Sequence, residues 1–523
     1  MQNISSSAFI KSDSPPKRPS QWLGIILWVI FFIGIILRFY KLGSESLALD
    51  EATSFSDCHR PILDLLLGNF LNRSGVNGGF HFLLLRLVTQ ISTSEFALRF
   101  LSAVFGSFSI IFIYYLSTLL INGRRGQKMG VYAAILLTFS PFHIIPSQFT
   151  RGYSLLFLLA IGAAIFQVRA LLFNRVRDFL GFVVCSILIY NTHVLSIIFI
   201  GGQALLVGWY FLFNAENRKR FFVRWSVCYL IIFAGIWKVF LNLQSFFLRV
   251  QAPPDQRWWL TKTSPTPGHK EIWEVIKSFS IGFLPESNPL TYLAVILPAL
   301  FLAGFLSRKV KEGWLRSWEF SFGFFLFIFP LATSFSFSQG ENMFTSIYLF
   351  YTLPFIYLLA ARGLLKIPVR IIPEAILCFS LIAPLFSIHQ IFTVPRYPDW
   401  RKAVTHILSN QGPNDMVAIN ANYTHIIFNY YVRNVPPGLR PQVYTMHNYS
   451  GDEKIADAER NRIGKEFDEI ARNNRRMWLI SDYTWETDPL NLVEIEAKSR
   501  YRALTYWPGP PRLFLFILTP PPS

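Results

Sequence analysis

Residues 22–51 read WLGIILWVIFFIGIILRFYKLGSESLALDE, an apolar run followed after a short polar stretch by the acidic pair Asp50-Glu51. Nineteen to twenty apolar residues are the length that an α-helix needs to cross a bilayer. A carboxylate close to hydrocarbon is costly to keep charged, so the pair indicates a cavity, an ion or a cationic partner. The alternative interpretation is a solvated acidic loop, and both are open at this point.

The composition is that of a membrane protein. Hydrophobic residues make up 52% of the 523 positions and charged residues 15%, with 52 Phe and 14 Trp. The net charge of +18 is carried by basic clusters between the apolar runs. Cytoplasmic loops of membrane proteins carry such clusters, so the basicity needs no nucleic-acid partner. We expect contacts with membrane lipids and none with nucleic acid.

Placing the basic clusters inside gives a consistent membrane topology with an odd number of spans. We predict about 11 transmembrane helices, near residues 22–40, 97–120, 130–146, 153–173, 178–191, 195–213, 225–245, 290–306, 318–337, 346–361 and 371–391. The expected domains are a cytoplasmic N-terminal tail (1–21), a transmembrane domain (22–392) with outer loops at 41–96 and 246–289, and an outer C-terminal domain (393–523).

The C-terminal tail differs in composition from the rest. Asp415–Ile419, Met477–Ile480 and Arg512–Leu518 are short apolar runs that predict buried strands, and the polar stretch Glu453–Asn473 between them favours a helix. This alternation predicts a small α/β domain outside the membrane.

Several polar groups follow the predicted spans on the outer side. Arg151 and Tyr153 lie between spans three and four, and His193 lies between spans five and six. An arginine can hold a phosphate through two hydrogen bonds, and a carboxylate can act as a base or bind a metal. Together they suit a phosphate-bearing lipid substrate.

Each of these residues has a structural alternative. Arg151 can form an ion pair with Asp50 or Glu51, and His193 can be a hydrogen-bonded residue at a helix end. Tyr153 and the Trp258-Trp259 pair are also typical of an interfacial aromatic belt. The sequence contains no Cys/His metal motif, no phosphate-cradling glycine-rich loop and no nucleophile elbow.

These stretches resemble the GT-C class of polyprenyl-phosphate-sugar-dependent glycosyltransferases, and more closely the bacterial protein-mannosyltransferase and aminoarabinose-transferase-like superfamily. The similar stretches cover most of residues 25–430 and are Leu37–Gly43 with Asp50-Glu51-Ala52, Ser94–Ser102, Leu137–His143 with Ser147-Gln148 and Arg151–Leu155, Tyr190–His193, Leu353–Phe355 with Leu359–Leu364, and Asp399-Trp400-Arg401.

The resemblance implies a GT-C fold in the bacterial inner membrane, with a cytoplasmic N-terminus and a periplasmic C-terminal domain. It implies inverting transfer of a sugar from a polyprenyl-phosphate donor to a glycan, lipid or protein acceptor on the periplasmic side. Asp50 becomes the candidate base and Glu51 its partner, and the two are the candidate ligands if a divalent metal takes part. Arg151 becomes a candidate phosphate contact. The other candidate substrate-binding residues are Tyr153, Gln148, His193, His81, Asn77 and Trp258.

Three positions depart from the family pattern. Residues 77–81 read NGGFH where many relatives have His-Pro-Pro-Leu-Tyr, Phe149 replaces a Glu, and Ile347 replaces an Arg in front of Tyr348. Two alternatives are therefore open beside an active transferase, namely a catalytically inactive GT-C-like scaffold of an envelope polysaccharide assembly and a transporter of a lipid-linked glycan. The odd span count and the outer domain do not suggest the paired inverted repeats of transporters.

Overall fold

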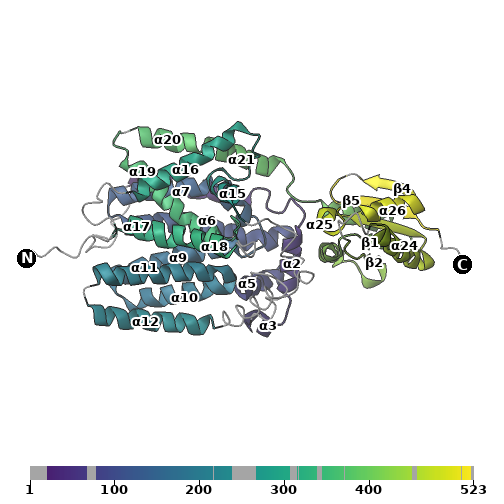
Figure 1. The fold of residues 1–523 in the computed structure, drawn as a ribbon, viewed down its shortest axis with the longest axis horizontal. Coiled ribbons are helices and arrows are strands. Elements are labelled where there is room, and N and C mark those ends of the chain that lie inside the picture. The colour runs from purple at the N-terminus through teal and green to yellow at the C-terminus, as the bar shows by residue number, and fades with distance from the viewer. Residues whose placement is uncertain are drawn as a thin grey trace, which may run out of the picture. The chain divides into compact units, whose positions relative to one another are not determined.

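The computed structural model describes residues 21–67, 78–215, 217–237, 267–306, 315, 317–338, 344–369, 371–449, 456–507 and 509–519. Contacts divide the chain into two units (Figure 1). The first, which we call the membrane unit, comprises Met1–Leu42 and Cys58–Val394. The second, which we call the sheet unit, comprises Gly43–Asp57 and Pro395–Ser523, so it includes the acidic pair Asp50-Glu51.

The described part of the membrane unit is helical throughout. Its longer helices are α1 (Gln21–Phe39), α5 (Gly79–Thr89), α6 (Glu95–Leu120), α7 (Arg124–Thr138), α9 (Tyr153–Phe173), α10 (Val176–Thr192), α11 (Ile197–Asn214), α12 (Arg218–Gly235), α15 (His269–Ile281), α16 (Ile296–Phe305), α19 (Leu353–Lys366) and α21 (Ile382–Thr393). The shorter ones are α3 (Ile62–Leu67), α8 (Pro141–Ser147), η1 (Val194–Ser196), η3 (Pro289–Val295), α17 (Trp318–Gly323), η6 (Phe324–Ile328), α18 (Phe329–Phe337), η7 (Phe350–Thr352) and α20 (Ile372–Ser380).

Six continuous stretches of helix among the described residues are long and apolar enough to cross a membrane, and a seventh is added if the bent pair α7–α8 is one span. These stretches make the chain a multi-pass membrane protein. The predicted helical membrane protein with a small C-terminal sheet is therefore confirmed in this coarser form. Helices α10, α12, η3 with α16, and η7 with α19 overlap the remaining predicted spans, and residues 238–245 of the predicted span 225–245 lie outside the described residues. The count of 11 spans stays a prediction.

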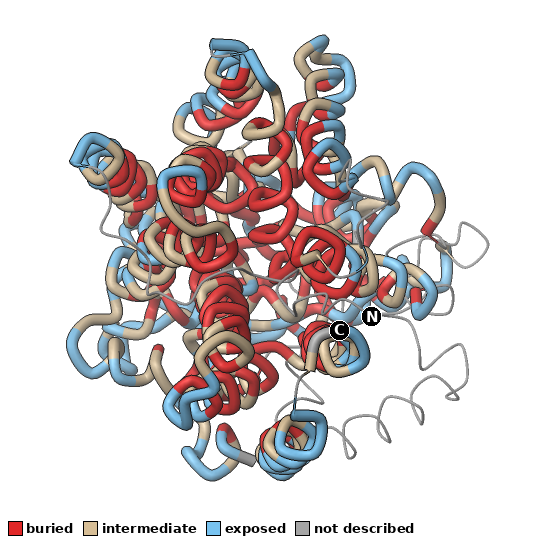
Figure 2. Tube along the Cα trace, turned by 90° about the vertical axis from the view of Figure 1, so that its left-hand side faces the viewer, coloured by how far each residue is buried: buried red, intermediate tan, exposed pale blue. Residues whose placement is uncertain are grey.

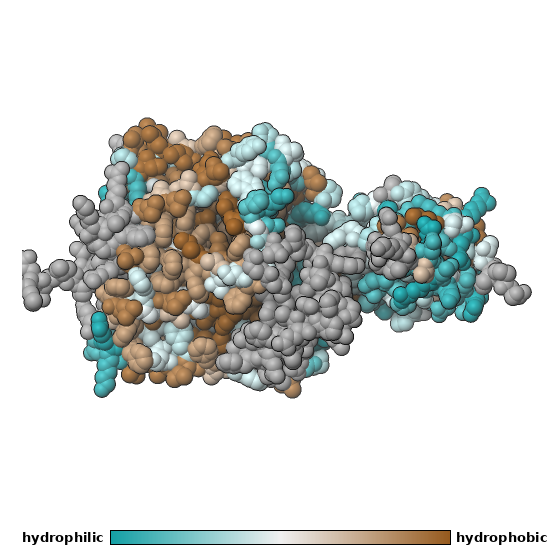
Figure 3. Space-filling model, in the orientation of Figure 1, coloured by the Kyte–Doolittle hydropathy of each residue, from teal (hydrophilic) through white to brown (hydrophobic). Residues whose placement is uncertain are grey.

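Burial in the membrane unit follows from its apolar composition. Figure 2 shows buried residues on the sides of the helices that face one another and exposed residues on the outward sides. The visible face of this unit in Figure 3 is a broad apolar band. Exposed apolar side chains such as Trp28, Phe32 and Ile36 on α1 belong to this outward surface. In a bilayer such side chains face acyl chains, which are as apolar as they are.

Two glycines allow α16 and α19 to pack in direct backbone contact. A Cβ atom on Gly304 would lie 1.9 Å from the carbonyl oxygen of Leu359, and one on Gly363 would lie 2.1 Å from that of Leu300. Small residues at helix contacts in membranes let the backbones approach closely.

The sheet unit is built on a five-stranded mixed sheet of order β2-β1-β3-β5-β4. Its strands are β1 (Asp415–Ile419), β2 (Gln442–Thr445), β3 (Arg476–Ser481), β4 (Arg502–Trp507) and β5 (Arg512–Ile517). Strands β2, β1 and β3 are parallel, and β5 runs antiparallel to both β3 and β4. Its helices are α2 (Leu49–Asp57), α22 (Trp400–Asn410), η8 (Asn422–Thr424), α23 (His425–Val432), η9 (Pro437–Leu439), α24 (Ala456–Asn473), α25 (Thr484–Thr487) and α26 (Leu492–Arg500).

Helices cover both faces of this sheet. Alternate residues of β1, β3 and β5 point to opposite faces, as strand geometry requires. One face packs on α24 and α26, with Ala418, Leu479 and Phe514 in its core. The other packs on α22 and α23 and includes Ala52 of α2. The segment that follows the first span is thus part of the core of the C-terminal fold.

Polar contacts hold the segment 43–57 in the sheet unit. The guanidinium group of Arg401 donates to the carbonyl groups of Gly43, Ser44 and Glu45, and Arg396 forms an ion pair with Glu45 at 2.8 Å. The backbone N–H of Leu47 donates to the hydroxyl group of Tyr431 at 2.8 Å. The start of α2 is fixed by these contacts.

The α16–α19 contact can be tested with one added methyl group. Gly363→Ala should lower the melting temperature of the detergent-solubilised protein, because backbone must move to make room, and overpacking of this kind costs about 1–3 kcal/mol. Gly208→Ala on α11 is the matched control, because nothing lies within 4 Å of the added Cβ. Equal melting temperatures for both variants would contradict the close contact.

Candidate functional site

The two carboxylates of the acidic pair have different environments. Glu51 is fully buried, and its Oε2 accepts the backbone N–H of Ala48 at 3.1 Å. This is the contact by which a glutamate at the third position of a helix caps its first turn. Asp50 lies one residue earlier and is exposed. Glu51 therefore has a structural contact, whereas the side chain of Asp50 is exposed.

A second group of predicted residues meets in the membrane unit. Arg151 lies in the turn between α8 and α9, Tyr153 begins α9, and His193 follows α10. The rings of Tyr153 and His193 are 5.9 Å apart between centroids. The charge of Arg151 is close enough to His81 and His193 to act on the pKa of both. All four side chains are buried.

Glycines bring these segments together. The N–H of Gly78 donates to the carbonyl group of Thr192 at 2.9 Å, and a Cβ on Gly78 would lie 2.1 Å from the carbonyl oxygen of Asn191. A Cβ on Gly152 would lie 2.9 Å from Cγ2 of Thr192 and 3.2 Å from Cβ of His81. The start of α5, the end of α10 and the turn before α9 therefore converge because two of the contacting residues have no side chain.

Both histidines of this group are held neutral. Burial, with a smaller contribution from the charge of Arg151, lowers the pKa of His81 and that of His193 to about 3. Nε2 of His81 and both ring nitrogens of His193 have no hydrogen-bond partner among the described residues. Near neutral pH the group therefore combines one fixed positive charge with ring nitrogens available to a ligand. It suits an anion better than a cation.

Tyr348 joins this group and was not among the predicted site residues. Its ring lies 5.5 Å from that of His193. The signal in the sequence was the tyrosine that remains of the altered Arg-Tyr pair. We name Arg151, Tyr153, His193, His81 and Tyr348 the arginine–histidine cluster.

The remaining predicted residues lie elsewhere. Nε2 of Gln148 contacts the carbonyl oxygens of Leu37, Arg38 and Tyr40, so its amide group closes the C-terminal end of α1. Asn77 and Trp258 lie outside the described residues. The same holds for residues 1–20 of the predicted tail and residues 246–266 of the second outer loop.

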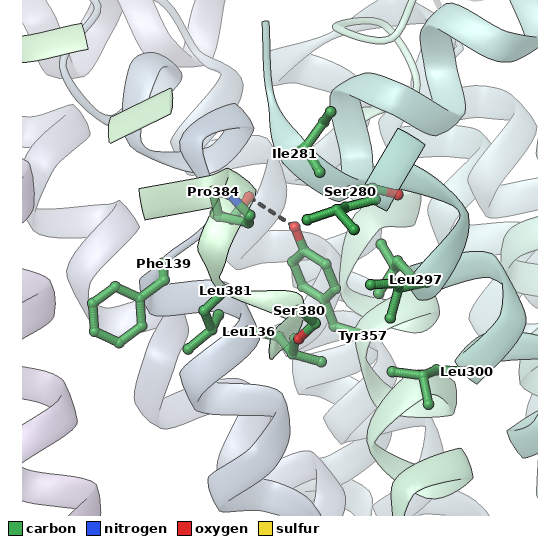
Figure 4. A pocket seen from close by; sticks show the side chains of 13 residues that line it. Leu136, Phe139, Ser280, Ile281, Leu297, Leu300, Tyr357, Ser380, Leu381 and Pro384 are labelled. Carbon is green, nitrogen blue, oxygen red and sulfur yellow. Dashed lines mark hydrogen bonds between the residues drawn. The ribbon is translucent and has the colours of Figure 1, made fainter. Parts of the chain in front are cut away.

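A small cavity lies apart from this cluster. It has a volume of about 20 Å³, enough for one water molecule, and is lined by residues of α7, α15, η3, α16, α19, α20 and α21. Figure 4 shows the Tyr357 ring among the residues that line this cavity, with its hydroxyl end on the side of Ser280. The Tyr357 hydroxyl group lies 2.7 Å from Oγ of Ser140, while the hydroxyl group of Ser280 has no partner among the described residues. A buried water there would satisfy Ser280, and no residue of the arginine–histidine cluster lines the cavity.

The buried histidines predict acid sensitivity of the membrane unit. Because the folded pKa is lowered, the unfolded chain binds more protons than the folded chain between pH 6.5 and about 3, so stability falls as the pH falls through this window. Between neutral pH and a pH of about 4.5, the melting temperature of His193→Asn should therefore fall by a few degrees less than that of the wild type. The matched control is His269→Asn, because His269 is exposed at the start of α15. A variant as acid-sensitive as the wild type would contradict the buried neutral ring.

The sequence matches no protein-family model and no curated protein. Solved structures resemble the chain over almost its whole length. ArnT from Cupriavidus metallidurans in the apo state gives a TM-score of 0.54 at 11% identity, covering 96% of this chain and 99% of that chain. The same protein bound to undecaprenyl phosphate gives 0.53 at 12% identity, with the same coverage.

The oligosaccharyltransferase AglB from Archaeoglobus fulgidus, in complex with an inhibitory peptide and a dolichol-phosphate, is also similar. Its TM-score is 0.51 at 13% identity, and the match covers 95% of this chain and 74% of that chain. ArnT and AglB are GT-C glycosyltransferases. The chain has the GT-C fold, as its sequence predicted.

Proposed function

We propose that the chain is a membrane glycosyltransferase that moves a sugar from a polyprenyl-phosphate donor to an acceptor on the periplasmic side of the bacterial inner membrane. The observation that carries the proposal is the arginine–histidine cluster, a buried positive charge among neutral rings, in a chain with the GT-C fold. Two proteins of the same fold are described with a polyprenyl phosphate or a dolichol-phosphate bound, which supports a donor of this class.

The transfer proceeds with inversion at the sugar carbon. The Asp50 carboxylate takes the proton of the acceptor hydroxyl group while the hydroxyl oxygen forms a bond with the anomeric carbon. The bond between that carbon and the phosphate oxygen breaks, and its electron pair leaves with the polyprenyl phosphate. Arg151 offsets the charge that develops on the phosphate, and the histidine ring nitrogens donate hydrogen bonds to its oxygens.

Asp50 is better suited to the base than Glu51. A base must reach the acceptor, and Asp50 is exposed, whereas Glu51 is buried and bonded to the backbone of Ala48. The same contact argues against the pair as a metal site. The described residues contain no group of three or more His, Cys, Asp or Glu side chains that could hold a metal ion. The proposed transfer is therefore written without a step that uses a metal ion.

Asp50→Asn tests the base. Transfer of the labelled sugar from a polyprenyl-phosphate donor by membranes of the expressing cells should fall roughly 10²–10⁴-fold, because general-base catalysis is worth about that much. Protein level and melting temperature should stay near the wild type, since Asp50 is exposed. Asp457→Asn is the matched control, because that side chain is 97% exposed on α24. Undiminished transfer by a folded Asp50→Asn protein would contradict the assignment of Asp50 as the base. It would favour a scaffold that does not catalyse transfer.

Arg151→Ala tests the phosphate contact. Affinity for undecaprenyl phosphate should fall roughly 10–100-fold, because a hydrogen bond to a charged group contributes about 1.5–3 kcal/mol. Arg151→Lys should restore part of the affinity, since it keeps the charge but not the planar fork. Binding is measured on purified protein in nanodiscs, with Arg169→Ala as the comparison, because Arg169 pairs with Asp178. Equal affinity of wild type and Arg151→Ala would remove Arg151 from the donor site.

A further inference from the structure

The topology of the sheet unit singles out one edge of its sheet. Strands β1 and β3 are parallel neighbours. The chain leaves β1 towards α23 on one face and leaves β3 towards α26 on the other, where each helix packs into a different core. In open α/β sheets, ligands bind at the carboxyl ends of the strands where successive connections diverge in this way. We call this place the switch edge.

Polar side chains that can bind hydroxyl groups follow both strands at the switch edge. Asn420 follows β1 and is fully buried, and its Nδ2 donates to Asp488 at 3.2 Å while its Oδ1 has no partner among the described residues. Asp482 follows β3, where it accepts the indole N–H of Trp400 at 2.7 Å and the backbone N–H of Tyr483. Burial raises the pKa of Asp482 and of Asp488.

Three aromatic rings follow the same two strands. Tyr423 comes three residues after Asn420, Tyr483 comes directly after Asp482, and Trp485 comes three residues after Asp482. Ring centroids of Tyr423 and Tyr483 are 6.0 Å apart, and those of Tyr483 and Trp485 are 6.4 Å apart with planes tilted by 38°. Trp485 is 67% exposed, which is unusual for a tryptophan outside the membrane unit.

The switch edge also connects to the segment that carries Asp50. Ser46 donates to the Asp399 carboxylate at 2.8 Å, and the next residue, Trp400, donates to Asp482 at 2.7 Å. Both ends of this chain of contacts lie in the sheet unit. The segment 43–57, which carries Asp50, is therefore anchored at the same edge of the sheet as the three aromatic rings.

The geometry points to a carbohydrate-binding surface at the switch edge, formed by Trp485, Tyr483 and Tyr423, that takes a hexopyranose ring of an acceptor glycan. A sugar ring stacks its C–H face on an aromatic ring, whose face is negatively polarised. Its hydroxyl groups bond to a carboxylate such as that of Asp482, which is partly exposed. The inference rests on the proposed transferase function only in naming the glycan as the acceptor.

A peptide fits this surface less well. Peptides dock by adding a strand to an open sheet edge or by placing side chains in pockets. At the switch edge the backbone is already paired, because Asn420 donates its N–H to Ile480 and Met446 donates its N–H to Ile419. The features that remain to bind a ligand are the aromatic rings and the hydroxyl-binding groups beside them, and these favour a sugar.

The test measures binding of cellohexaose and maltohexaose to the full-length protein in nanodiscs by saturation-transfer NMR. The wild type should bind at least one of them with a Kd on the order of 1 mM or tighter. Trp485→Ala should weaken binding about tenfold, and Trp485→Phe should restore most of it. The matched control is Tyr506→Ala on β4, because Tyr506 is 53% exposed but its ring face is already covered by Phe514 at 4.8 Å.

Three outcomes overturn the inference: no binding of either oligosaccharide by the wild type, equal binding by Trp485→Ala, or Trp485-dependent binding of a blocked hexapeptide in place of the sugars. Undecaprenyl phosphate binding on the same samples tests the transferase proposal separately. Trp485-dependent sugar binding without undecaprenyl phosphate binding would support the surface and contradict the transferase.

Discussion

The last carbonyl groups of α1 must find hydrogen-bond partners, and the path of the chain after this helix depends on them. The last carbonyl groups of a helix have no partner within it, and an apolar bundle offers no water to replace one. Gln148 meets the carbonyl groups of Leu37, Arg38 and Tyr40, and the Arg99 guanidinium group donates to that of Leu42 at 3.0 Å. These hydrogen bonds hold the backbone of the last residues before the chain leaves the membrane unit.

Buried arginines in the membrane unit fall into two kinds. Arg38 is fully buried, and its guanidinium group reaches the carbonyl groups of Gly34 and Leu137 and Nδ1 of His143. Its hydrogen bonds join α1 to α7 and α8, so its role is structural. Arg151 instead lies among neutral histidine rings with available nitrogens. A charge inside a membrane protein is costly and is often functional, which agrees with the phosphate contact that we propose for Arg151.

The sequence predicted those elements whose side chains are buried. The runs 22–40 and 153–173 match α1 and α9 closely, and the run Asp415–Ile419 is β1 itself. The strands β2 and β4 were missed because most of their residues are exposed and carry no apolar alternation. Contacts distant in sequence were not predictable either, so the packing of Ala52 against the C-terminal fold is seen only in the structure. The same limit hid Tyr348, which reaches His193 from a distant part of the chain.

Adjacent carboxylates have different fates here because a helix begins between Ala48 and Leu49. At the third helical position the Glu51 side chain folds back to the first free N–H group, which also removes it from solvent. Asp50 occupies the second position, where the open N–H groups of the first turn favour a negative charge. Its side chain is exposed, and a base must be able to reach the acceptor. The cap made by Glu51 thus orders the helical turn that carries Asp50, the residue that we propose as the base.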